Sequence, residues 1–263
     1  MRPGSLRAGP LPRIALFSDV DGTLLDASNR LAITAGDVAR IAAHVELILA
    51  SSRTLVELGV LQRRLGVVAP LIAENGAVVS FPLRWRGGRA ARREIVVLGQ
   101  PVARLRPRIR KCAREAAVTI VDQRDVLPDR ARSLRRGYSV CVRDFPGPGA
   151  ERFLTALRRE NLRATRAGNW ITITQGADKG TGARTVLARA QRRGAPFAWN
   201  AAIGNAANDV PLFAASEGRF AIRNPRSGHH SALLDLPDVK PLASSGKRAW
   251  REALPMILAG GKP

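Results

Sequence analysis

The chain has 263 residues, 43 of them Lys or Arg against 21 Asp or Glu, and its formal net charge is +22. Hydrophobic residues make up 45% of it, a share that is ordinary for a globular protein and excludes a disordered or collagen-like chain. No stretch reaches the roughly 18 uninterrupted apolar residues of a transmembrane helix, and the two cysteines do not make a disulfide framework. We expect a cytoplasmic protein with a large core and without a membrane partner.

The positive charge comes from arginine rather than lysine, because only five lysines occur. The arginines are scattered from end to end and aromatic residues make up only 5%, whereas a nucleic-acid site gathers basic residues on one face beside stacking aromatics. We interpret the excess as mainly compositional and exposed to solvent. Binding of anionic substrates or of nucleic acid stays open, and the positive field draws phosphorylated ligands towards the protein.

The first third of the chain alternates buried apolar runs with segments of helical period, which is typical of βαβ units. In chain order the pattern predicts a strand over residues 14–18, a helix over 35–43, a strand over 45–50, a helix over 54–65 and a short strand over 71–73. The same texture returns near the end, with a helix over 179–193, a strand over 197–203, a helix over 208–215 and a strand over 219–223.

The middle of the chain differs in texture. It carries a basic helix over residues 102–117, a strand over 138–143, a helix over 149–161 and a strand over 170–174. We therefore predict an α/β fold, with a Rossmann-like, doubly wound parallel sheet as the core. Residues 1–81 and 177–263 would form this core, and residues 82–176 an inserted α+β domain.

Two carboxylates, Asp19 and Asp21, follow the first predicted strand in the segment Asp19-Val-Asp-Gly-Thr23. The carboxyl ends of parallel strands face the crevice in which α/β proteins bind ligands. One carboxylate can attack as a nucleophile while the other moves a proton, and together they can hold a hard divalent cation. An Asp-Gly turn exposed to solvent is the alternative interpretation.

This segment resembles the first motif of the haloacid dehalogenase superfamily of phosphatases. Ser51, after the second strand, resembles the phosphate-binding hydroxyl of the second motif, and Lys179 resembles the lysine of the third. Gly204-Asn-Ala-Ala-Asn-Asp209 stands in the place of the metal-binding fourth motif. A finer resemblance, to the mannosyl-3-phosphoglycerate phosphatase family, is carried by Ser51-Ser-Arg-Thr54, Glu74-Asn-Gly76, Gly176-Ala-Asp-Lys-Gly180 and Ser245-Gly-Lys-Arg-Ala-Trp250.

The resemblance implies a Mg²⁺-dependent phosphatase with a mobile cap inserted between the second and third motifs, where the insert lies in this sequence. Asp19 would attack phosphorus to form an aspartyl phosphate, and Asp21 would serve as general acid and then general base. Ser51 and Lys179 would hold the transferring oxygens. The metal ligands that the resemblance implies are Asp19, Asp21, Asn205 and Asp209.

Asn205 departs from the pattern, because the family usually has an aspartate at this position. An amide oxygen can bind Mg²⁺ without contributing a charge, so we expect weaker metal affinity. A catalytically dead member is the alternative. A third possibility is that Asn205 caps a loop and that Asp209 or water takes its place.

Substrate recognition is assigned to residues beside the motifs and in the insert. Thr23, Ser52, Arg53 and Asn75 lie next to the motif residues, although Asn75 can equally form a turn with Gly76. In the insert, arginine suits a substrate carboxylate, so the candidates are Arg135, Arg136 and Tyr138. An exposed strand edge explains these three equally well.

We predict a phosphoric monoester hydrolase that acts on a small sugar-type metabolite, with mannosyl-3-phosphoglycerate as the favoured substrate. Another small phosphorylated metabolite is the first alternative. The second is an impaired member that binds nucleic acid or a protein partner through its arginine-rich surface. The combination of Asp19, Asp21, Ser51, Lys179 and Asp209 argues against this last reading, since a pure binding protein has no chemical need for it.

Overall fold

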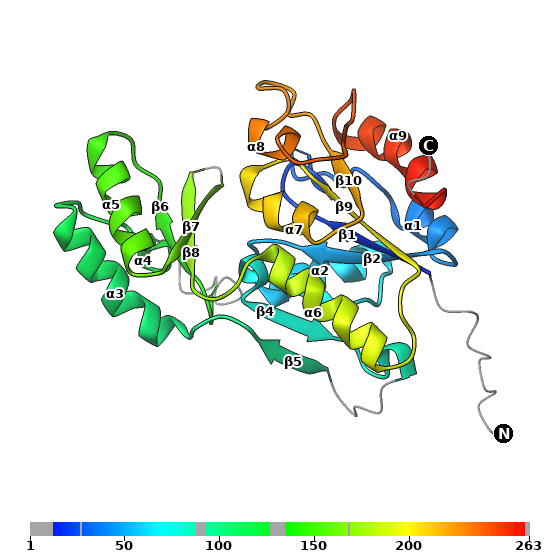
Figure 1. Ribbon diagram of the computed structural model, residues 1–263, viewed down its shortest axis with the longest axis horizontal. Helices are drawn as coiled ribbons and strands as arrows, with labels where there is room; N and C mark the ends of the chain where they lie inside the picture. The colour runs from blue at the N-terminus through cyan, green and yellow to red at the C-terminus, as the bar shows by residue number, and fades with distance from the viewer. Residues whose placement is uncertain (1–12, 27, 88–92, 127–134, 168, 261–263) are drawn as a thin grey trace.

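The computed structural model describes residues 13–26, 28–87, 93–126, 135–167 and 169–260. Two lobes face each other in it (Figure 1). The chain leaves the larger lobe after β5 and returns to it at α6, so the smaller lobe is an insertion. No helix in the described ranges has the length and apolar character to cross a bilayer.

The larger lobe is built on an eight-stranded sheet, in the order β11-β10-β9-β1-β2-β3-β4-β5 within the described residues. Its strands are β1 Ile14–Ser18, β2 Val45–Ala50, β3 Leu71–Ala73, β4 Val78–Phe81, β5 Glu94–Val97, β9 Trp199–Gly204, β10 Gly218–Ala221 and β11 Val239–Pro241. The strands from β11 to β3 pair in parallel, whereas β4 and β5 extend the sheet in antiparallel pairing.

Helices cover both faces of this sheet. They are α1 Ala35–Ile41, α2 Leu55–Leu65, α6 Lys179–Arg192, α7 Val210–Ala214, α8 Ser231–Leu234 and α9 Gly246–Leu258. Successive residues of β1 point to opposite faces, so Leu16 joins one apolar cluster with Leu58 and Trp250, while Phe17 joins another with Val186. The continuous apolar run of β1 therefore reflects burial on both sides, as expected for a central parallel strand.

The smaller lobe contains a three-stranded antiparallel sheet, in the order β6-β8-β7 within the described residues. Its elements are α3 Val102–Glu115, α4 Gln123–Val126, β6 Val140–Arg143, α5 Pro148–Arg159, β7 Arg163–Ala167 and β8 Trp170–Thr174. Ile171 and Ile173 of β8 pack with Leu105 and Phe153 under the two long helices. The intervening Thr172 lines a pocket between the lobes.

The predicted fold class, a doubly wound α/β core with an inserted α+β domain, is confirmed by this arrangement. One predicted boundary needs correction, because Glu94–Val97 falls inside the expected insert at 82–176 but pairs with β4 of the large sheet. Sheet membership alone therefore places the start of the insert after Val97, and we propose this boundary for the cap domain. The sequence did not predict β7, whose segment Arg163-Ala-Thr-Arg-Ala167 has too few apolar residues to read as a strand.

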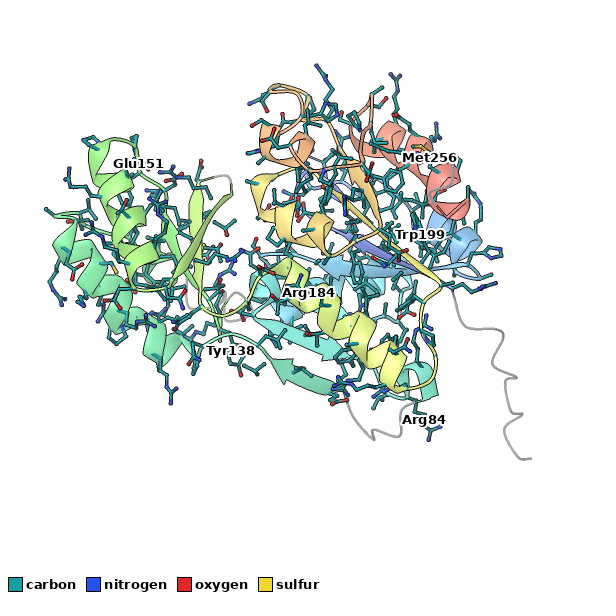
Figure 2. The ribbon with its side chains drawn as sticks, viewed as in Figure 1. Arg84, Tyr138, Glu151, Arg184, Trp199 and Met256 are labelled. Atoms are coloured by element: carbon teal, nitrogen blue, oxygen red, sulfur yellow. The ribbon has the colours of Figure 1, made fainter. Side chains whose placement is uncertain are left out.

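Side chains at the junction connect the lobes. Figure 2 shows Glu151 on the outer part of the smaller lobe and Tyr138 close to the connection with the larger one. Tyr138 packs against the apolar cluster that contains Leu16 and Trp250. It is thus a structural contact between the lobes.

Candidate active site

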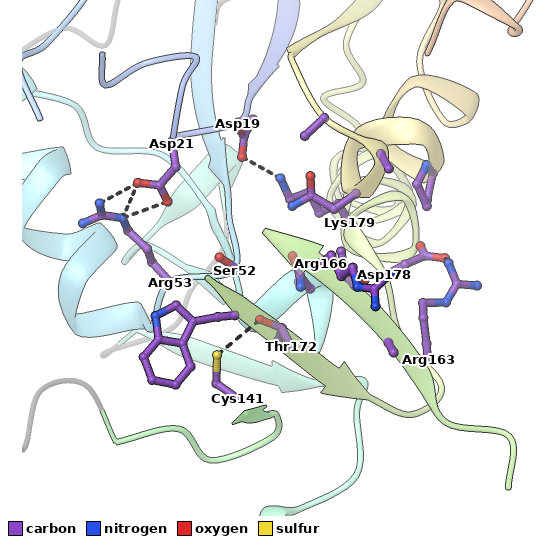
Figure 3. Close-up of a pocket in the computed structure, with 18 of the residues that line it drawn as sticks. Asp19, Asp21, Ser52, Arg53, Cys141, Arg163, Arg166, Thr172, Asp178 and Lys179 are labelled. Atoms are coloured by element: carbon purple, nitrogen blue, oxygen red, sulfur yellow. Dashed lines mark hydrogen bonds and ion pairs between the residues drawn. The ribbon is translucent and has the colours of Figure 1, made fainter. Parts of the chain in front are cut away.

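A pocket of about 1080 Å³ separates the two lobes. Its floor is the carboxyl-terminal edge of the large sheet, where β1, β2 and β9 end and α6 begins (Figure 3). Asp19, Lys179 and Asn205 line this floor, and β7 and β8 form the roof. This is the position at which open α/β sheets bind their ligands.

Lys179 lies at the centre of the floor, between two carboxylates. Its Nζ is 2.6 Å from Asp19 Oδ1 and 2.6 Å from Asp209 Oδ1. The side chain of Lys179 is fully buried, as is that of Asp209, and 6% of the Asp19 side chain is exposed. Asp178 caps α6 by accepting a hydrogen bond of 2.7 Å from the Thr181 backbone N–H, so the helix starts with Lys179 already aimed at the strand ends.

Burial and charge act against each other in this group. Burial alone would lower the pKa of Lys179, but the Asp19 and Asp209 carboxylates outweigh it and raise that pKa above its usual value. Burial, followed by the neighbouring Asp209 carboxylate, raises the pKa of Asp19 to about 7, although Lys179 opposes the shift. The Lys179 ammonium therefore compensates the negative charge of two carboxylates in one buried site.

Asp209 is saturated by contacts within the protein. Besides the Lys179 ammonium at Oδ1, its Oδ2 accepts hydrogen bonds from the backbone N–H groups of Asn205 at 3.0 Å and Ala206 at 3.1 Å. Asp209 does not line the pocket. It shapes the loop after β9 and holds Lys179, and its predicted role as a metal ligand stays a prediction.

Asp21 points away from Asp19 and pairs with Arg53. Arg53 Nη2 lies 2.6 Å from Asp21 Oδ1, and Arg53 Nε lies 3.1 Å from Asp21 Oδ2. The two side chains line the pocket and are partly exposed (Figure 3). The Asp21 carboxylate, expected from the sequence to be a metal ligand, is thus occupied by a guanidinium, and the backbone carbonyl of Asp21 lies 3.2 Å from the side-chain amide of Asn205.

Oxygen ligands converge on the side-chain amide of Asn205. One atom of this amide lies 3.2 Å from Asp19 Oδ2, from the Asp21 backbone carbonyl and from the Thr23 hydroxyl. If this atom is the amide nitrogen, it donates hydrogen bonds to these oxygens. If the amide is turned so that this atom is its oxygen, the result is a cluster of oxygens that a cation would stabilise. A Cβ on Gly22 would lie 2.3 Å from the amide, and the φ of Gly22 is +80°, so glycine is required for this approach.

This donor set fits Mg²⁺, which prefers carboxylate, carbonyl and amide oxygens. The fit involves Asp19 Oδ2, the Asp21 carbonyl and the Asn205 amide oxygen. Among the described residues no group of three or more His, Cys, Asp or Glu side chains is placed to hold a metal. A site here would therefore depend on backbone and amide oxygens, and it would carry less negative charge than a cluster of carboxylates.

The loops after β2 and β3 complete the floor. A capping box between Thr54 and Glu57 starts α2, which leaves Ser51 at the end of β2 with its hydroxyl accepting from the Arg53 N–H at 3.2 Å. Ser51 is fully buried and is not part of the pocket lining, whereas Ser52 is. Thr23 is also buried, and its carbonyl accepts a bond of 3.0 Å from the Trp250 indole.

Asn75 is the clearest unsatisfied group of the floor. Its side chain lines the pocket, is only 5% exposed, and neither its amide oxygen nor its nitrogen has a hydrogen-bond partner. The residue adopts a left-handed conformation, with φ 55°. A buried amide without partners is costly, so it indicates a ligand group that completes its hydrogen bonds.

Glu74 and Arg136 bridge the lobes on this side of the pocket. The Glu74 carboxylate accepts bonds from the Gly137 N–H at 3.0 Å, the Tyr138 N–H at 2.9 Å and the Ser139 hydroxyl at 2.7 Å. Arg136 lines the pocket and donates to the Ser52 carbonyl and to Gln123. Arg135 is exposed outside the pocket lining, so of the three predicted candidates in the insert only Arg136 reaches the pocket.

The roof contains residues that the sequence analysis missed. Cys141, Thr172 and Thr165 lie side by side on β6, β8 and β7, and all three line the pocket together with Trp170. On the β7 side, Arg163 lines the pocket and pairs with Asp178 at 2.9 Å. The alternation Trp170-Ile-Thr-Ile-Thr174 was the available signal, because its polar members had to face away from the core of the insert.

The chain is similar to known hydrolases. Residues 16–85 match the family model of haloacid dehalogenase-like hydrolases. Over 271 aligned positions, covering 93% of this chain and 97% of the relative, the chain is 27% identical to the glucosyl-3-phosphoglycerate/mannosyl-3-phosphoglycerate phosphatase of Persephonella marina. The chain is thus similar to haloacid dehalogenase-like hydrolases over residues 16–85 and to a phosphatase over most of its length.

Solved structures show that this hydrolase shares its fold with phosphatases of the superfamily. A phosphatase of Bacteroides thetaiotaomicron aligns with a TM-score of 0.64 at 18% identity, covering 95% of this chain and 97% of the other. The sucrose-phosphatase of Synechocystis sp. PCC6803, in complex with sucrose and phosphate, aligns with a TM-score of 0.62 at 13% identity, covering 94% and 98%. The predicted class of enzyme, a phosphoric monoester hydrolase, is confirmed.

Proposed function

We propose that this hydrolase is a Mg²⁺-dependent phosphatase that removes the phosphate of glucosyl- or mannosyl-3-phosphoglycerate through an aspartyl-phosphate intermediate. The observation that supports the chemistry is the buried Lys179 ammonium held 2.6 Å from both Asp19 and Asp209 at the floor of the pocket. The relative from Persephonella marina supports the substrate. We also propose a cytoplasmic location.

Asp19 carries out the bond-forming step. One of its carboxylate oxygens attacks phosphorus, the bond from phosphorus to the ester oxygen breaks, and Asp21 gives a proton to the departing oxygen. Water then attacks the aspartyl phosphate, Asp21 takes the proton of that water, and inorganic phosphate leaves with Asp19 restored. Asp21 must exchange its contact with Arg53 for the leaving oxygen before it can act.

Lys179, Ser51 and Asn75 position the reacting groups. Lys179 keeps the Asp19 carboxylate oriented and places a positive charge beside the transferring phosphoryl oxygens. The Ser51 hydroxyl and the unpartnered Asn75 amide supply hydrogen bonds at the same end of the pocket. When bound at Asp19, the Asp21 carbonyl and Asn205, Mg²⁺ supplies further neutralisation of phosphoryl charge.

The test is phosphate release from a panel that contains both glycosyl-3-phosphoglycerates, sucrose phosphate and simple hexose phosphates, with Mg²⁺ and after chelation. We expect the glycosyl-3-phosphoglycerates to have the highest kcat/KM, and Asp19→Asn to lose activity towards the whole panel. Trapping of a phosphorylated enzyme at Asp19 by rapid quench would support the intermediate. Turnover that persists in Asp19→Asn would contradict the proposed mechanism.

A further inference from the structure

Arg53 holds the side chain that the proposed reaction needs as its proton donor. The guanidinium contacts both oxygens of Asp21, at 2.6 Å through Nη2 and at 3.1 Å through Nε. Such two-point pairs are strong and have a defined orientation. While this pair persists, both Asp21 oxygens face Arg53, and neither is directed at a leaving group above Asp19.

The backbone of Arg53 is fixed, whereas its side chain faces the pocket. The Arg53 N–H donates to the Ser51 hydroxyl at 3.2 Å, and the Arg53 carbonyl accepts from the Glu74 N–H at 2.9 Å. The side chain is 26% exposed and that of Asp21 is 52% exposed, so an incoming anion can reach the guanidinium directly. The Glu57 carboxylate lies 3.9 Å from Arg53 Nη1 and helps to keep the guanidinium oriented when its contact with Asp21 is lost.

We propose that Arg53 binds the carboxylate of the substrate, and that this binding releases Asp21. The substrate carboxylate takes the place of Asp21 on the guanidinium. The freed Asp21 carboxylate takes up a proton from solvent and turns towards the ester oxygen, to which it then gives that proton. The exchange replaces one ion pair by another, so it leaves no buried charge unpaired. This inference rests on the proposed function, because in a 3-phosphoglycerate the carboxyl carbon lies three bonds from the ester oxygen.

Selectivity follows from this exchange. A phosphate ester without a carboxylate leaves Asp21 on Arg53 and is hydrolysed slowly, even if it fits the pocket. An ester with a carboxylate at the right distance binds and also frees the acid. Arg53 is thus a specificity-determining residue that contacts the substrate and positions a catalytic one.

The experiment compares glucosyl-3-phosphoglycerate with its carboxamide, which has the same shape without the charge, on the full chain in the presence of Mg²⁺. In the wild type we expect the carboxamide to have a kcat/KM about 10- to 100-fold lower, with much of the loss in kcat. Arg53→Met should raise KM for the carboxylate substrate and bring the ratio between the two substrates close to one. For the carboxamide it should increase kcat above the wild-type value, because Asp21 is no longer held.

Two further variants keep this test decisive. Arg53→Lys retains the positive charge but not the two-point geometry of the guanidinium. Compared with Arg53→Met, it should restore part of the preference for the carboxylate substrate. Arg64→Met, at an exposed arginine of helix α2, which follows Arg53, controls for the loss of a positive charge and should keep the wild-type ratio. Circular dichroism confirms that each variant is folded.

Three outcomes separate the two proposals. An increase in kcat for the carboxamide in Arg53→Met supports the exchange. Equal hydrolysis of both substrates by the wild type, or equal losses for both in Arg53→Met, overturns the role of Arg53 and leaves the proposed function standing. No hydrolysis of either glycosyl-3-phosphoglycerate substrate, with turnover of other sugar phosphates, overturns the proposed substrate and this inference with it.

Discussion

The floor and the roof of the pocket are built in different ways. On the floor, Lys179, Asp19 and Asp209 are nearly or fully buried and hold one another at 2.6 Å. On the roof, the pocket-facing residues come from a small antiparallel sheet and make few contacts with one another, such as the 3.7 Å approach of Cys141 and Thr172. A preorganised floor suits bond making and breaking, and an open roof suits recognition of a substrate that must enter and leave.

The largest expected effect is on the floor. In Lys179→Met, two buried carboxylates lose their cation, so we expect kcat to fall by at least about 10³-fold and the free energy of unfolding to fall by about 3–5 kcal/mol. Steady-state kinetics and urea unfolding measure the two effects. Lys247→Met, an exposed change on α9, is the matched control. A variant with nearly normal kcat would show that the floor is not the reaction centre.

The connection between floor and roof should respond to Glu74→Gln. An amide in place of the carboxylate cannot accept all three bonds from Gly137, Tyr138 and Ser139, so about 1–3 kcal/mol of stability is lost. Faster limited proteolysis between the lobes would locate the loss at their junction. Glu115→Gln, at an exposed glutamate of α3, is the control. Unchanged stability and proteolysis would mean that the lobes are held together by other contacts.

Asn205→Asp tests the proposed metal site on the floor. Replacing the amide by a carboxylate adds negative charge beside Asp19 Oδ2 and the Asp21 carbonyl, so the Mg²⁺ concentration for half-maximal activity should fall about tenfold. Titration of activity with Mg²⁺ and calorimetry of Mg²⁺ binding are the measurements. Asn29→Asp adds the same charge in an exposed turn. An identical Mg²⁺ requirement would remove Asn205 from the ligand set.

The roof should show a smaller effect of a different kind. Thr172→Val keeps the shape of a pocket-lining residue and removes its hydroxyl, so KM for the sugar substrate should rise about 3- to 10-fold with kcat changed less than twofold. Thr155→Val on α5, outside the pocket lining, is the control. A large fall in kcat with constant KM would place Thr172 in the chemistry rather than in recognition.

The smallest expected effect concerns helix α1, which contributes no residue to the floor or the roof of the pocket. Hydrogen bonds from the Thr34 backbone, and then from its hydroxyl, lower the pKa of Asp37 in the capping box of α1. A lowered pKa contributes stability above the ordinary pKa of the group, and this is lost as the pH falls through the lowered value. Asp37→Asn should thus be less stable than wild type by at most about 1 kcal/mol at pH 7, with a smaller gap at pH 3. A gap that does not depend on pH would contradict this assignment.

Much of the floor was accessible to prediction because of where its residues stand in the chain. Asp19, Ser51 and Asn205 each follow a buried strand, and parallel strands bring their carboxyl ends to one edge. Lys179 opens a helix after a polar N-cap. These are local signals, and the topology needed to combine them follows from the βαβ pattern.

The contacts between distant side chains were not accessible in the same way. The pairing of Asp21 with Arg53, the contact of Asp209 with Lys179 and the three bonds to Glu74 join residues that no spacing rule connects. The strand β7 went unpredicted because its charged and small residues become a strand only by pairing with β8.

The sequence by itself therefore determined the class of fold, the order of the motifs and the residues able to carry phosphoryl chemistry, because these depend on periodicity and on residue type. Only the tertiary structure decided that Asp21 is held by Arg53, that the Asp21 carbonyl and the Asn205 amide lie together beside Asp19, and that Thr172 rather than Tyr138 lines the pocket. Those outcomes depend on side-chain direction and on packing between segments far apart in the chain. Local pattern carries no information about either.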